Sequence, residues 1–472
     1  MKLDNGEKTI FLLTFLFALP IFMSGILYQD DILRSANGEA YWGVLGRPLS
    51  DFFVMLIGFG RDFVINTFPL SLVIATVALS SSSIILYRRF SIQKNIFSGL
   101  VFSIFSLSPL YLQNLSYQFD SMPMMLGVLF SVLPYSNLIN NLSTRYKLLI
   151  SSILLISSLS LYQATINIFI GLAAFEAIYL ILQKKDINEI IKIITIKVTM
   201  LFISMFIYMM VIAKIFVSSA VNTSLIFSSA NPSGSFFINI DKILRILDGM
   251  NNSPFYLAWS IPVIISLFAF LLLISKTLFS NKAKTIKLLE LLILIFSVFI
   301  ILFSIIGPFV FIDKTIIAPR VMMGLPVVFL LITYLCSTYK SNFVMLISCS
   351  MPILISLSIS SAYGNATKYQ RSLEESIFYN ISSSIPKGWD NKKIIINGSV
   401  SVSAATKMEF NRYPILRWMV IPLNDWSGMV MLKHYNIDAT MGRINTKKTD
   451  KCIYDNAYFS LCEGEVNIIN LK

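Results

Sequence analysis

Long apolar runs separated by short polar connections occupy residues 1–362 of the chain. A helix needs about 20 mostly apolar residues to cross a membrane, and helices are favoured because a lipid-exposed backbone must satisfy its own hydrogen bonds. The pattern predicts about 11 transmembrane helices, at residues 9–28, 67–87, 96–112, 121–139, 147–163, 165–183, 197–217, 254–275, 287–311, 322–338 and 343–362. The composition agrees, since 56% of the residues are hydrophobic, 13% are charged and the mean hydropathy is +0.73. We therefore expect an all-α polytopic membrane protein.

Two polar stretches of this transmembrane domain are long enough to carry function. Residues 29–66 mix apolar, small and polar positions in a way that suits helices lying along the membrane surface. Residues 218–253 combine a turn rich in Ser, Asn and Gly with an amphipathic helix. That helix could serve as a gate.

The tail, residues 363–472, differs from the rest in composition. It carries charges of both signs, several turn signals and short β-like runs such as KKIIINGSV and GEVNIINL. The pattern predicts a small α+β domain that opens with a helix over residues 369–382. Cys452 and Cys462 lie in its last strand-like region and are candidates for a disulfide in an oxidising compartment.

The positive charges indicate the orientation of the chain in the membrane. Lysine and arginine gather in alternate connections, at residues 2–8, 88–94, 145–147, 184–192 and 276–287. By the positive-inside rule, the N-terminus lies in the cytoplasm, and the tail and both polar stretches lie outside. The first apolar segment is too long for the core of a signal peptide, so we expect it to be retained. The net charge of +13 reflects this topology, and no basic stripe indicates a nucleic-acid partner.

Three acids of the first outer stretch are candidates for catalysis. Asp30 and Asp31 stand where the first apolar segment meets water, and Glu39 follows shortly after. A carboxylate there could act as a general base that accepts a proton from a sugar hydroxyl. Adjacent residues point in different directions, so at most one of the pair is the base. Alternatively, either aspartate caps a helix or pairs with Arg34, and Glu39 is a solvated loop acid.

Three arginines that we expect on the same outer side of the membrane are candidates for binding a phosphate. Arg34, Arg47 and Arg320 could hold a departing phosphate by charge-assisted hydrogen bonds. Arg47, in the run GRPLS, could instead contact a lipid headgroup. Arg320 is costly near lipid and therefore a functional candidate, although it could also extend to the headgroups.

Aromatic and polar residues elsewhere on this side are candidates for holding a sugar. Tyr117, Gln118 and Asp120 lie together in LSYQFDSMPM, where hydrogen bonds and ring contacts to a sugar are available; Asp120 could alternatively cap the next helix. In the tail, three tryptophans could stack on a sugar or form the core of the domain; they are Trp389, Trp418 and Trp426.

Three motifs carry a resemblance to a known family. The run YQDDILR after the first span, GEAYWGVLGRPL after it and SYQFDSMPM after the third span, with the external tail, resemble the serotype-converting O-antigen glucosyltransferases of temperate phages and bacterial O-antigen loci. The resemblance implies a GT-C-like glycosyltransferase of the bacterial inner membrane with a periplasmic tail. It implies undecaprenyl-phosphate glucose as donor, supplied by a partner synthase and flippase, and an O-antigen repeat unit of lipopolysaccharide as acceptor. It also marks Asp30, Asp31 and Glu39 as catalytic candidates without deciding which is the base.

Other classes of membrane protein remain as alternatives. An O-antigen polymerase would share the substrate and compartment. A transporter or flippase of lipid-linked sugars would more often show internal repeats and ionisable residues near mid-membrane, whereas Glu176 and Lys214 look isolated. No acidic cluster is dense enough to argue for a bound divalent metal, so metal dependence is left open and no cofactor is assigned.

Overall fold

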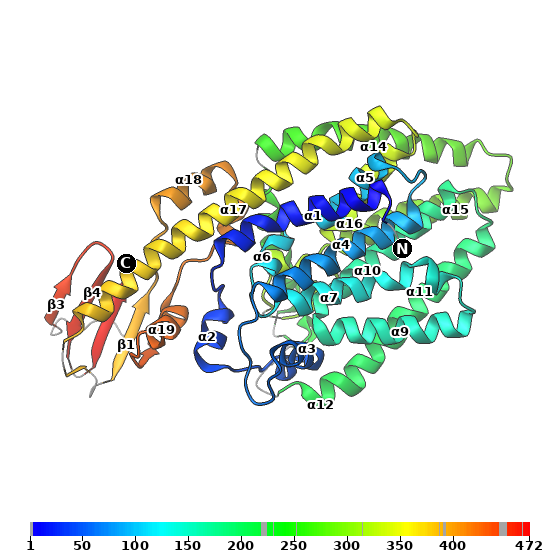
Figure 1. Ribbon diagram of the computed structural model, residues 1–472. Coiled ribbons are helices and arrows are strands. Elements are labelled where there is room, and N and C mark those ends of the chain that lie inside the picture. Colours follow the sequence, from blue (N-terminus) through cyan, green and yellow to red (C-terminus); the bar gives the residue numbers. More distant parts are fainter. Residues whose placement is uncertain are drawn as a thin grey trace.

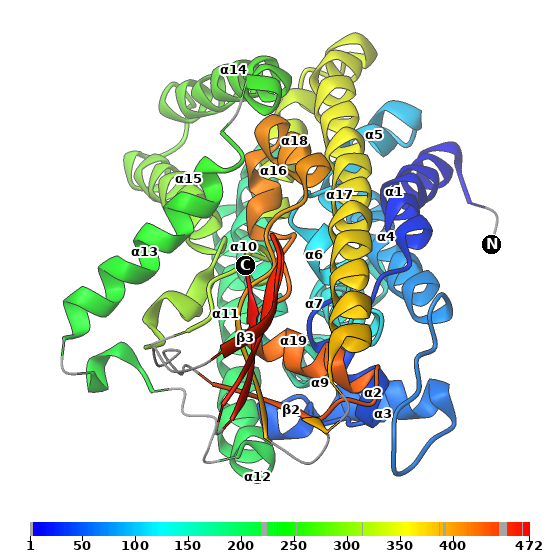
Figure 2. The same ribbon diagram turned by 90° about the vertical axis from the view of Figure 1, so that its left-hand side faces the viewer.

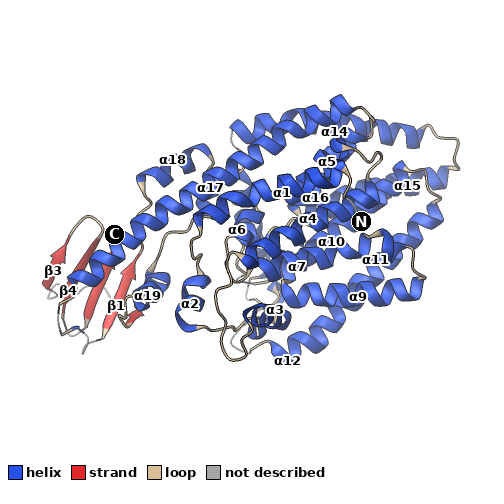
Figure 3. Cartoon of the chain, in the orientation of Figure 1, coloured by secondary structure: helices blue, strands red, loops and turns tan. Residues whose placement is uncertain are grey.

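The computed structural model describes residues 3–218, 224–229, 231–251, 253–313, 315–386, 388–389, 393–442, 451–464 and 466–472. In this part of the chain the architecture is a bundle of helices with a small sheet at one end (Figure 1; Figure 3). The N-terminus lies toward the opposite end of the bundle (Figure 1).

Nine helical segments in the described residues are long and apolar enough to cross a membrane. They are α1 (Asn5–Ser24), α4 (Leu70–Phe90), α7 (Ser121–Val132) with its continuation to Asn140, α9 (Thr144–Leu161), α10 (Ile166–Leu182) with the turn before it, α11 (Ile187–Ile207) with its continuation to Phe216, α14 (Ser253–Leu278), α15 (Lys284–Phe303) and α17 (Asn342–Ser384). Each overlaps a predicted span, although α11 begins ten residues before the predicted residue 197 and α15 ends eight residues before the predicted residue 311. The chain is therefore a multi-pass membrane protein.

The two remaining predicted spans, at residues 96–112 and 322–338, are shorter helices. They are α5 (Ile96–Ser106) and α16 (Leu325–Ser337). Both are apolar and largely buried among their neighbours. A short turn and the helix α6 (Tyr111–Leu115) follow α5 and complete the predicted stretch in a broken path. The break places the polar residues of α6 at the sheet end of the bundle.

The first polar stretch forms short helices at the sheet end. Gly25, in the left-handed conformation with φ 58°, ends α1, and Gly38, with φ 69°, ends α2 (Asp30–Asn37). The turn η1 (Gly43–Leu45) and the apolar helix α3 (Pro48–Gly58) follow. In the second polar stretch, the predicted amphipathic helix is α13 (Pro232–Asp248). The short helices α2 and α3 thus connect α1 to α4, and α13 lies between α11 and α14.

The helix α17 runs without interruption for 43 residues, from the bundle into the tail. The last predicted span and the predicted first helix of the tail are therefore one helix, and the boundary expected at residues 362 and 363 lies inside it. Arg371, on the half of α17 that leads into the tail, donates a hydrogen bond to the Leu27 carbonyl, 2.7 Å away. The contact fixes the helix against the segment that leads into α2.

The tail is built around a five-stranded sheet in the order β2-β1-β5-β4-β3. The strands are β1 (Ile394–Gly398), β2 (Ala439–Met441), β3 (Lys451–Asp455), β4 (Phe459–Glu463) and β5 (Asn467–Leu471). β1 pairs in parallel with β2 and β5, while β4 is antiparallel to β3 and β5. Cys452 and Cys462 face each other across β3 and β4 and form a disulfide. The helices α18 (Ala404–Arg412) and α19 (Asp425–Lys433) complete the domain.

One expectation about the membrane interior is wrong. Glu176 on α10 is not isolated, because its carboxylate lies 3.1 Å from Arg89 and 3.5 Å from Lys197, both on neighbouring helices. Lys197 also lies 3.7 Å from the centre of the Tyr135 ring. The charges come from α4, α10 and α11, and Arg89 is 87 residues from Glu176, so spacing along the chain could not reveal the pairing.

Candidate active site

Five segments far apart in the sequence bring charged and aromatic side chains together at the sheet end of the bundle. They are the start of α2, the η1–α3 connection, the α6–α7 connection, residues 162–163 and the turn η7 (Pro319–Val321). Figure 2 views this end, with the sheet toward the viewer and α2, α3, α6 and α7 behind it. We call the charged members the acid–arginine cluster; they are Asp30, Asp31, Arg34, Arg47, Asp120 and Arg320.

Asp31 is fully buried and bound to the backbone. Its Oδ2 accepts hydrogen bonds from the backbone N–H of Tyr28 at 3.1 Å and of Gln118 at 2.7 Å, and Oδ1 accepts from that of Phe119 at 3.2 Å. Burial, then the nearby Asp120 carboxylate, raises the pKa of Asp31 to about 8, although the backbone donors oppose this shift. With both oxygens engaged, Asp31 joins α2 to the α6–α7 connection.

Arg34 and Asp120 form a buried ion pair. Nη1 of Arg34 lies 2.6 Å from Oδ2 of Asp120, and its guanidinium stacks 4.2 Å from the ring centre of Trp42. The Trp42 indole N–H donates to Oδ1 of the same carboxylate. Asp120 stands at the start of α7, but its side chain makes no capping hydrogen bond there. The proposed cap for Asp120 is therefore wrong, and Arg34 pairs with Asp120 rather than with Asp30 or Asp31.

Arg320 is held by its backbone and leaves most of its guanidinium free. Its N–H donates to Oε1 of Gln113 at 2.9 Å, and its carbonyl accepts from Asn114 at 3.1 Å and from the Tyr162 hydroxyl at 3.2 Å. Nη1 donates to the Tyr117 hydroxyl. Among the described residues no carboxylate lies within ion-pair distance of this guanidinium.

Arg47 is the other arginine of the acid–arginine cluster that has no carboxylate partner among the described residues. Its Nε donates to Oε1 of Gln163 at 2.7 Å, and the guanidinium lies 4.7 Å from the ring centre of Tyr162. Gln163 in turn donates to the Leu45 carbonyl at 2.7 Å. Arg47 is therefore fixed in place at the start of α3, with donors left over for a ligand.

Asp30 differs from its neighbour because its side chain makes no hydrogen bond or ion pair with any described residue. Burial, and then the Asp120 carboxylate, raise the pKa of Asp30, while Arg34, Arg320 and Arg47 oppose the rise. The carboxylate thus lies within the electrostatic reach of all three arginines of the cluster. Its side chain is only partly buried, so it is available to a substrate.

Glu39 shares no hydrogen bond or ion pair with the acid–arginine cluster in the described structure. It follows α2, and its Oε1 accepts a hydrogen bond from the Asn37 side chain at 3.1 Å. Gln118, in contrast, lies within the site but uses its amide on the protein: it donates to the Ile26 carbonyl at 2.9 Å and accepts from Asn66. Tyr117 reaches the cluster through Arg320.

The sequence model of the GtrII glucosyl transferase family matches residues 19–331. The chain belongs to this family. An uncharacterised 55.3 kDa protein from the gtrB 5′ region of Salmonella phage P22 is 29% identical over 469 residues, which cover 95% of this chain and 94% of that protein. No solved structure matches. The protein is therefore a membrane glucosyltransferase with a role in O-antigen modification, as the resemblance carried by the three motifs and the tail implied.

The family match contains every member of the acid–arginine cluster but ends before the sheet. The tail of the glucosyltransferase nevertheless contacts the site. The Tyr28 hydroxyl donates to the Met419 carbonyl at 2.6 Å, and His434 Nε2 lies 3.1 Å from the Ile32 carbonyl. Ile32 itself belongs to the hydrophobic core of the sheet domain. The tail therefore supports α2 directly.

The three tail tryptophans have different surroundings. Trp389 is 2% exposed and donates its indole N–H to Glu463 at 3.0 Å, so it is a core residue and not a surface for stacking a sugar. Trp426 packs against the same core, and Trp418 packs against the core of the bundle; both are only partly buried.

Sequence reasoning missed two residues that shape the site. Asp51 on α3 accepts hydrogen bonds from the backbone N–H groups of Trp42 at 3.1 Å and Gly43 at 2.6 Å, and burial raises its pKa. Trp42 was not among the predicted site residues, yet its side chain is fully buried and its indole N–H donates a hydrogen bond to the Asp120 carboxylate. The sequence offered one indication of both residues: in AYWGVLGRPLSD, a tryptophan and an aspartate flank two glycines, which is typical of a tight turn held by side chains.

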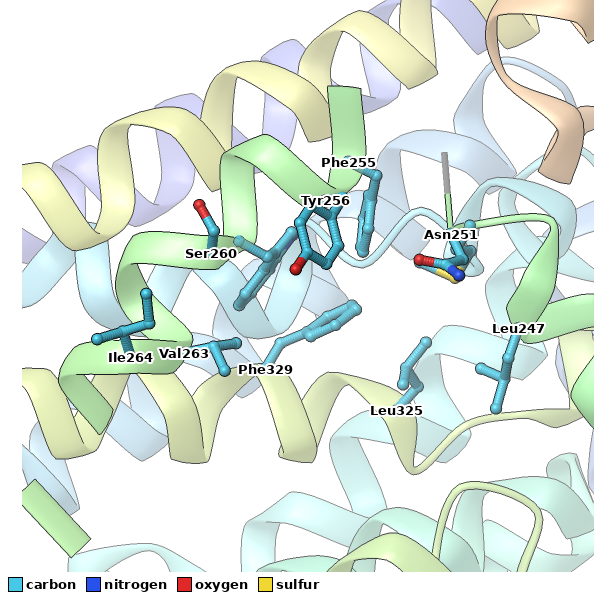
Figure 4. Close-up of a pocket in the computed structure, with 11 residues that line it drawn as sticks. Leu247, Asn251, Phe255, Tyr256, Ser260, Val263, Ile264, Leu325 and Phe329 are labelled. Atoms are coloured by element: carbon cyan, nitrogen blue, oxygen red, sulfur yellow. The ribbon is translucent and has the colours of Figure 1, made fainter. Parts of the chain in front are cut away.

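An apolar groove lies between α14, α16 and the end of α13. Its volume is about 320 Å³, and Figure 4 shows Phe329, Leu325 and Val263 along it, with Asn251 near one end. Trp259 and Phe329 stack within it, with ring centres 4.3 Å apart. α16 begins at Leu325, five residues after Arg320, so one connection links the groove to the acid–arginine cluster. We call it the α14–α16 groove.

Proposed function

We propose that the enzyme moves glucose from undecaprenyl-phosphate glucose to an O-antigen repeat unit of lipopolysaccharide on the periplasmic face of the inner membrane, with Asp30 as general base. The observation that carries the proposal is the contrast within the acid–arginine cluster. Asp31 and Asp120 are saturated by protein donors, whereas Asp30 is unpaired and lies within reach of two arginines that lack a carboxylate partner in the described chain.

The reaction follows from these positions. The acceptor hydroxyl loses its proton to the Asp30 carboxylate as its oxygen attacks the anomeric carbon of the glucose. The bond from that carbon to the phosphate oxygen breaks, and the polyprenyl phosphate leaves with the electron pair. Arg320 and Arg47 stabilise the charge that grows on the phosphate by charge-assisted hydrogen bonds. Such a direct displacement inverts the anomeric centre, and a partner synthase and flippase would supply the donor.

Two further features support the lipid carrier and the compartment. The α14–α16 groove begins five residues from Arg320 and continues along the outer part of α14 with apolar side chains, so it suits the hydrocarbon chain of a lipid-linked donor. The Cys452–Cys462 disulfide is typical of an oxidising compartment, which agrees with the positive-inside orientation.

The experiment that tests the proposal is transfer by the purified full-length enzyme in lipid nanodiscs, given undecaprenyl-phosphate glucose and an isolated O-antigen repeat unit. Mass spectrometry should show one hexose added to the acceptor for each glucose lost from the lipid. Longer repeat chains without added hexose would indicate a polymerase. Movement of intact lipid-linked glucose across a vesicle membrane without transfer would indicate a transporter. Either result would overturn the proposal.

A further inference from the structure

A second cavity opens at the other end of the bundle, where the N-terminus lies. Its volume is about 290 Å³, and its walls are the ends of α10, α14 and α16 and the α4–α5 connection. Gln183, Lys276, Tyr334 and Lys340 line it with polar groups, while Leu273, about one turn before Lys276 on α14, belongs to its apolar wall. None of these residues takes part in the acid–arginine cluster.

The cavity holds positive charge that nothing in the described protein neutralises. Lys276 and Lys340 reach it from two different elements, and neither lies within ion-pair distance of a described carboxylate. No aspartate or glutamate is among its lining residues. Elsewhere at this end, in contrast, Lys282 pairs with the buried Glu290.

Tyr334 provides a second, independent sign of a ligand. The residue is 1% exposed, and its hydroxyl has no hydrogen-bond partner in the described structure. The Gln183 side chain lies close to this hydroxyl without reaching hydrogen-bonding geometry. Burial of an unsatisfied hydroxyl is unfavourable, so the site lacks a hydrogen-bond acceptor.

We propose that this cavity binds the phosphate group of an anionic membrane phospholipid. Its oxygens would accept hydrogen bonds from the two lysine ammonium groups and the Tyr334 hydroxyl, and its acyl chains would follow the apolar wall at Leu273. Basic pockets between transmembrane helices bind anionic headgroups by this combination of charge and burial. The proposal concerns a separate site and does not depend on the glycosyl-transfer chemistry.

The test is native mass spectrometry of the full-length enzyme in detergent, exposed to phosphatidylglycerol or to phosphatidylcholine with the same acyl chains. The wild type should retain one phosphatidylglycerol and no phosphatidylcholine. The double variant Lys276→Ala/Lys340→Ala should bind phosphatidylglycerol about tenfold or more weakly, because it loses both positive charges that attract the anionic headgroup. The matched control Lys184→Ala/Lys192→Ala removes the same charge from exposed lysines near this end and should bind like the wild type.

A second variant keeps the test decisive if the lysine variant is unstable. Tyr334→Phe removes only the unpaired hydroxyl, so it should raise the Tm in phosphatidylcholine and reduce the additional rise that phosphatidylglycerol gives the wild type. Equal retention by the wild type and the lysine variant, or an equal loss in the control, would overturn the proposal. So would an equal Tm rise with inorganic phosphate alone, since the acyl chains would then contribute nothing.

Discussion

Arg34 on α2 and Asp120 at the start of α7 are 86 residues apart in sequence, yet their side chains form an ion pair with 2.6 Å between Nη1 and Oδ2. The pair engages the arginine nearest to Asp30 in sequence and the acid of the LSYQFDSMPM motif. Within the described acid–arginine cluster, Arg47 and Arg320 are therefore the arginines without a carboxylate partner, and Asp30 is the acid whose side chain has no partner; to these groups the proposal assigns the phosphate and the proton.

Removing the Asp30 carboxylate should stop the reaction without affecting the fold. Asp30→Asn removes the proposed base but no hydrogen bond that a described residue makes, so kcat should fall by about 10²–10⁴ while the Tm stays unchanged. The measurement is glucose transfer by equal amounts of purified enzyme. Asp62→Asn, at an exposed acid in the same outer stretch, is the control and should keep full activity. An Asp30→Asn enzyme that retains most of its rate would remove Asp30 from the mechanism.

The neighbouring substitution should behave differently. Asp31→Asn leaves a single acceptor oxygen for three backbone donors, so one buried N–H loses its partner at a cost of about 1–3 kcal/mol. We expect a lower Tm and less folded protein in the membrane, with the transfer rate per folded molecule reduced less than in Asp30→Asn. Size-exclusion chromatography after heating measures the first effect. A fully stable but inactive variant would transfer the role of base to Asp31.

The pH dependence should report the raised pKa of Asp30. A general base works in its ionised form, so kcat/KM should rise with pH through a pKa above the usual aspartate value of about 3.9 and then level off. Asp120→Asn removes the neighbouring negative charge and releases Arg34, and both changes favour the ionised base. The rising limb should therefore move to lower pH in that variant but not in Asp62→Asn. A limb that moves to higher pH contradicts the assignment.

Arg320 should act on the donor. Arg320→Lys keeps the charge but loses the planar fork that can bind two phosphate oxygens. Loss of one charge-assisted hydrogen bond corresponds to about a tenfold rise in KM for the lipid-linked donor, with the acceptor KM unchanged. Arg412→Lys, at an exposed arginine on α18, is the matched control. Unchanged kinetics over a donor titration would count against a phosphate-binding role.

Filling the α14–α16 groove should separate long donors from short ones. Ser260→Trp places a large ring among the lining residues, so KM should rise severalfold for undecaprenyl-phosphate glucose and stay constant for a donor with two isoprene units. Leu257→Trp, at an exposed position on the same helix that does not line the groove, is the control. Equal effects on both donors would show that the groove does not hold the hydrocarbon chain.

The sequence predicts the membrane part of the fold well, because each span is a local property of one apolar run. It also locates the acids and arginines at one end, since they follow or precede those runs. It cannot separate Asp30 from Asp31, because that difference depends on the backbone N–H groups of residues 118 and 119, which fold back onto α2. The pairing of Arg34 with Asp120 is hidden for the same reason.

The composition of the chain also could not predict that α17 is a single continuous helix. The change from apolar to mixed residues near position 362 reflects the change of solvent along the helix rather than a break in it. No proline follows Pro352 before the helix ends, so the backbone hydrogen bonds continue through the expected boundary.

This continuous helix constrains how the tail can diverge among related enzymes. A helix of 43 residues is about 65 Å long and turns by about 100° for each residue, so a single deletion would rotate the sheet domain about the helix axis and carry Met419 and His434 away from the acid-bearing segment. Only length changes close to a whole number of turns, such as about seven residues for two turns, would nearly restore the angular phase, and even those would change the height of the sheet above the bundle. Tails can therefore be exchanged between relatives only in register, because the contacts between the sheet domain and α2 depend on the angular position that α17 sets.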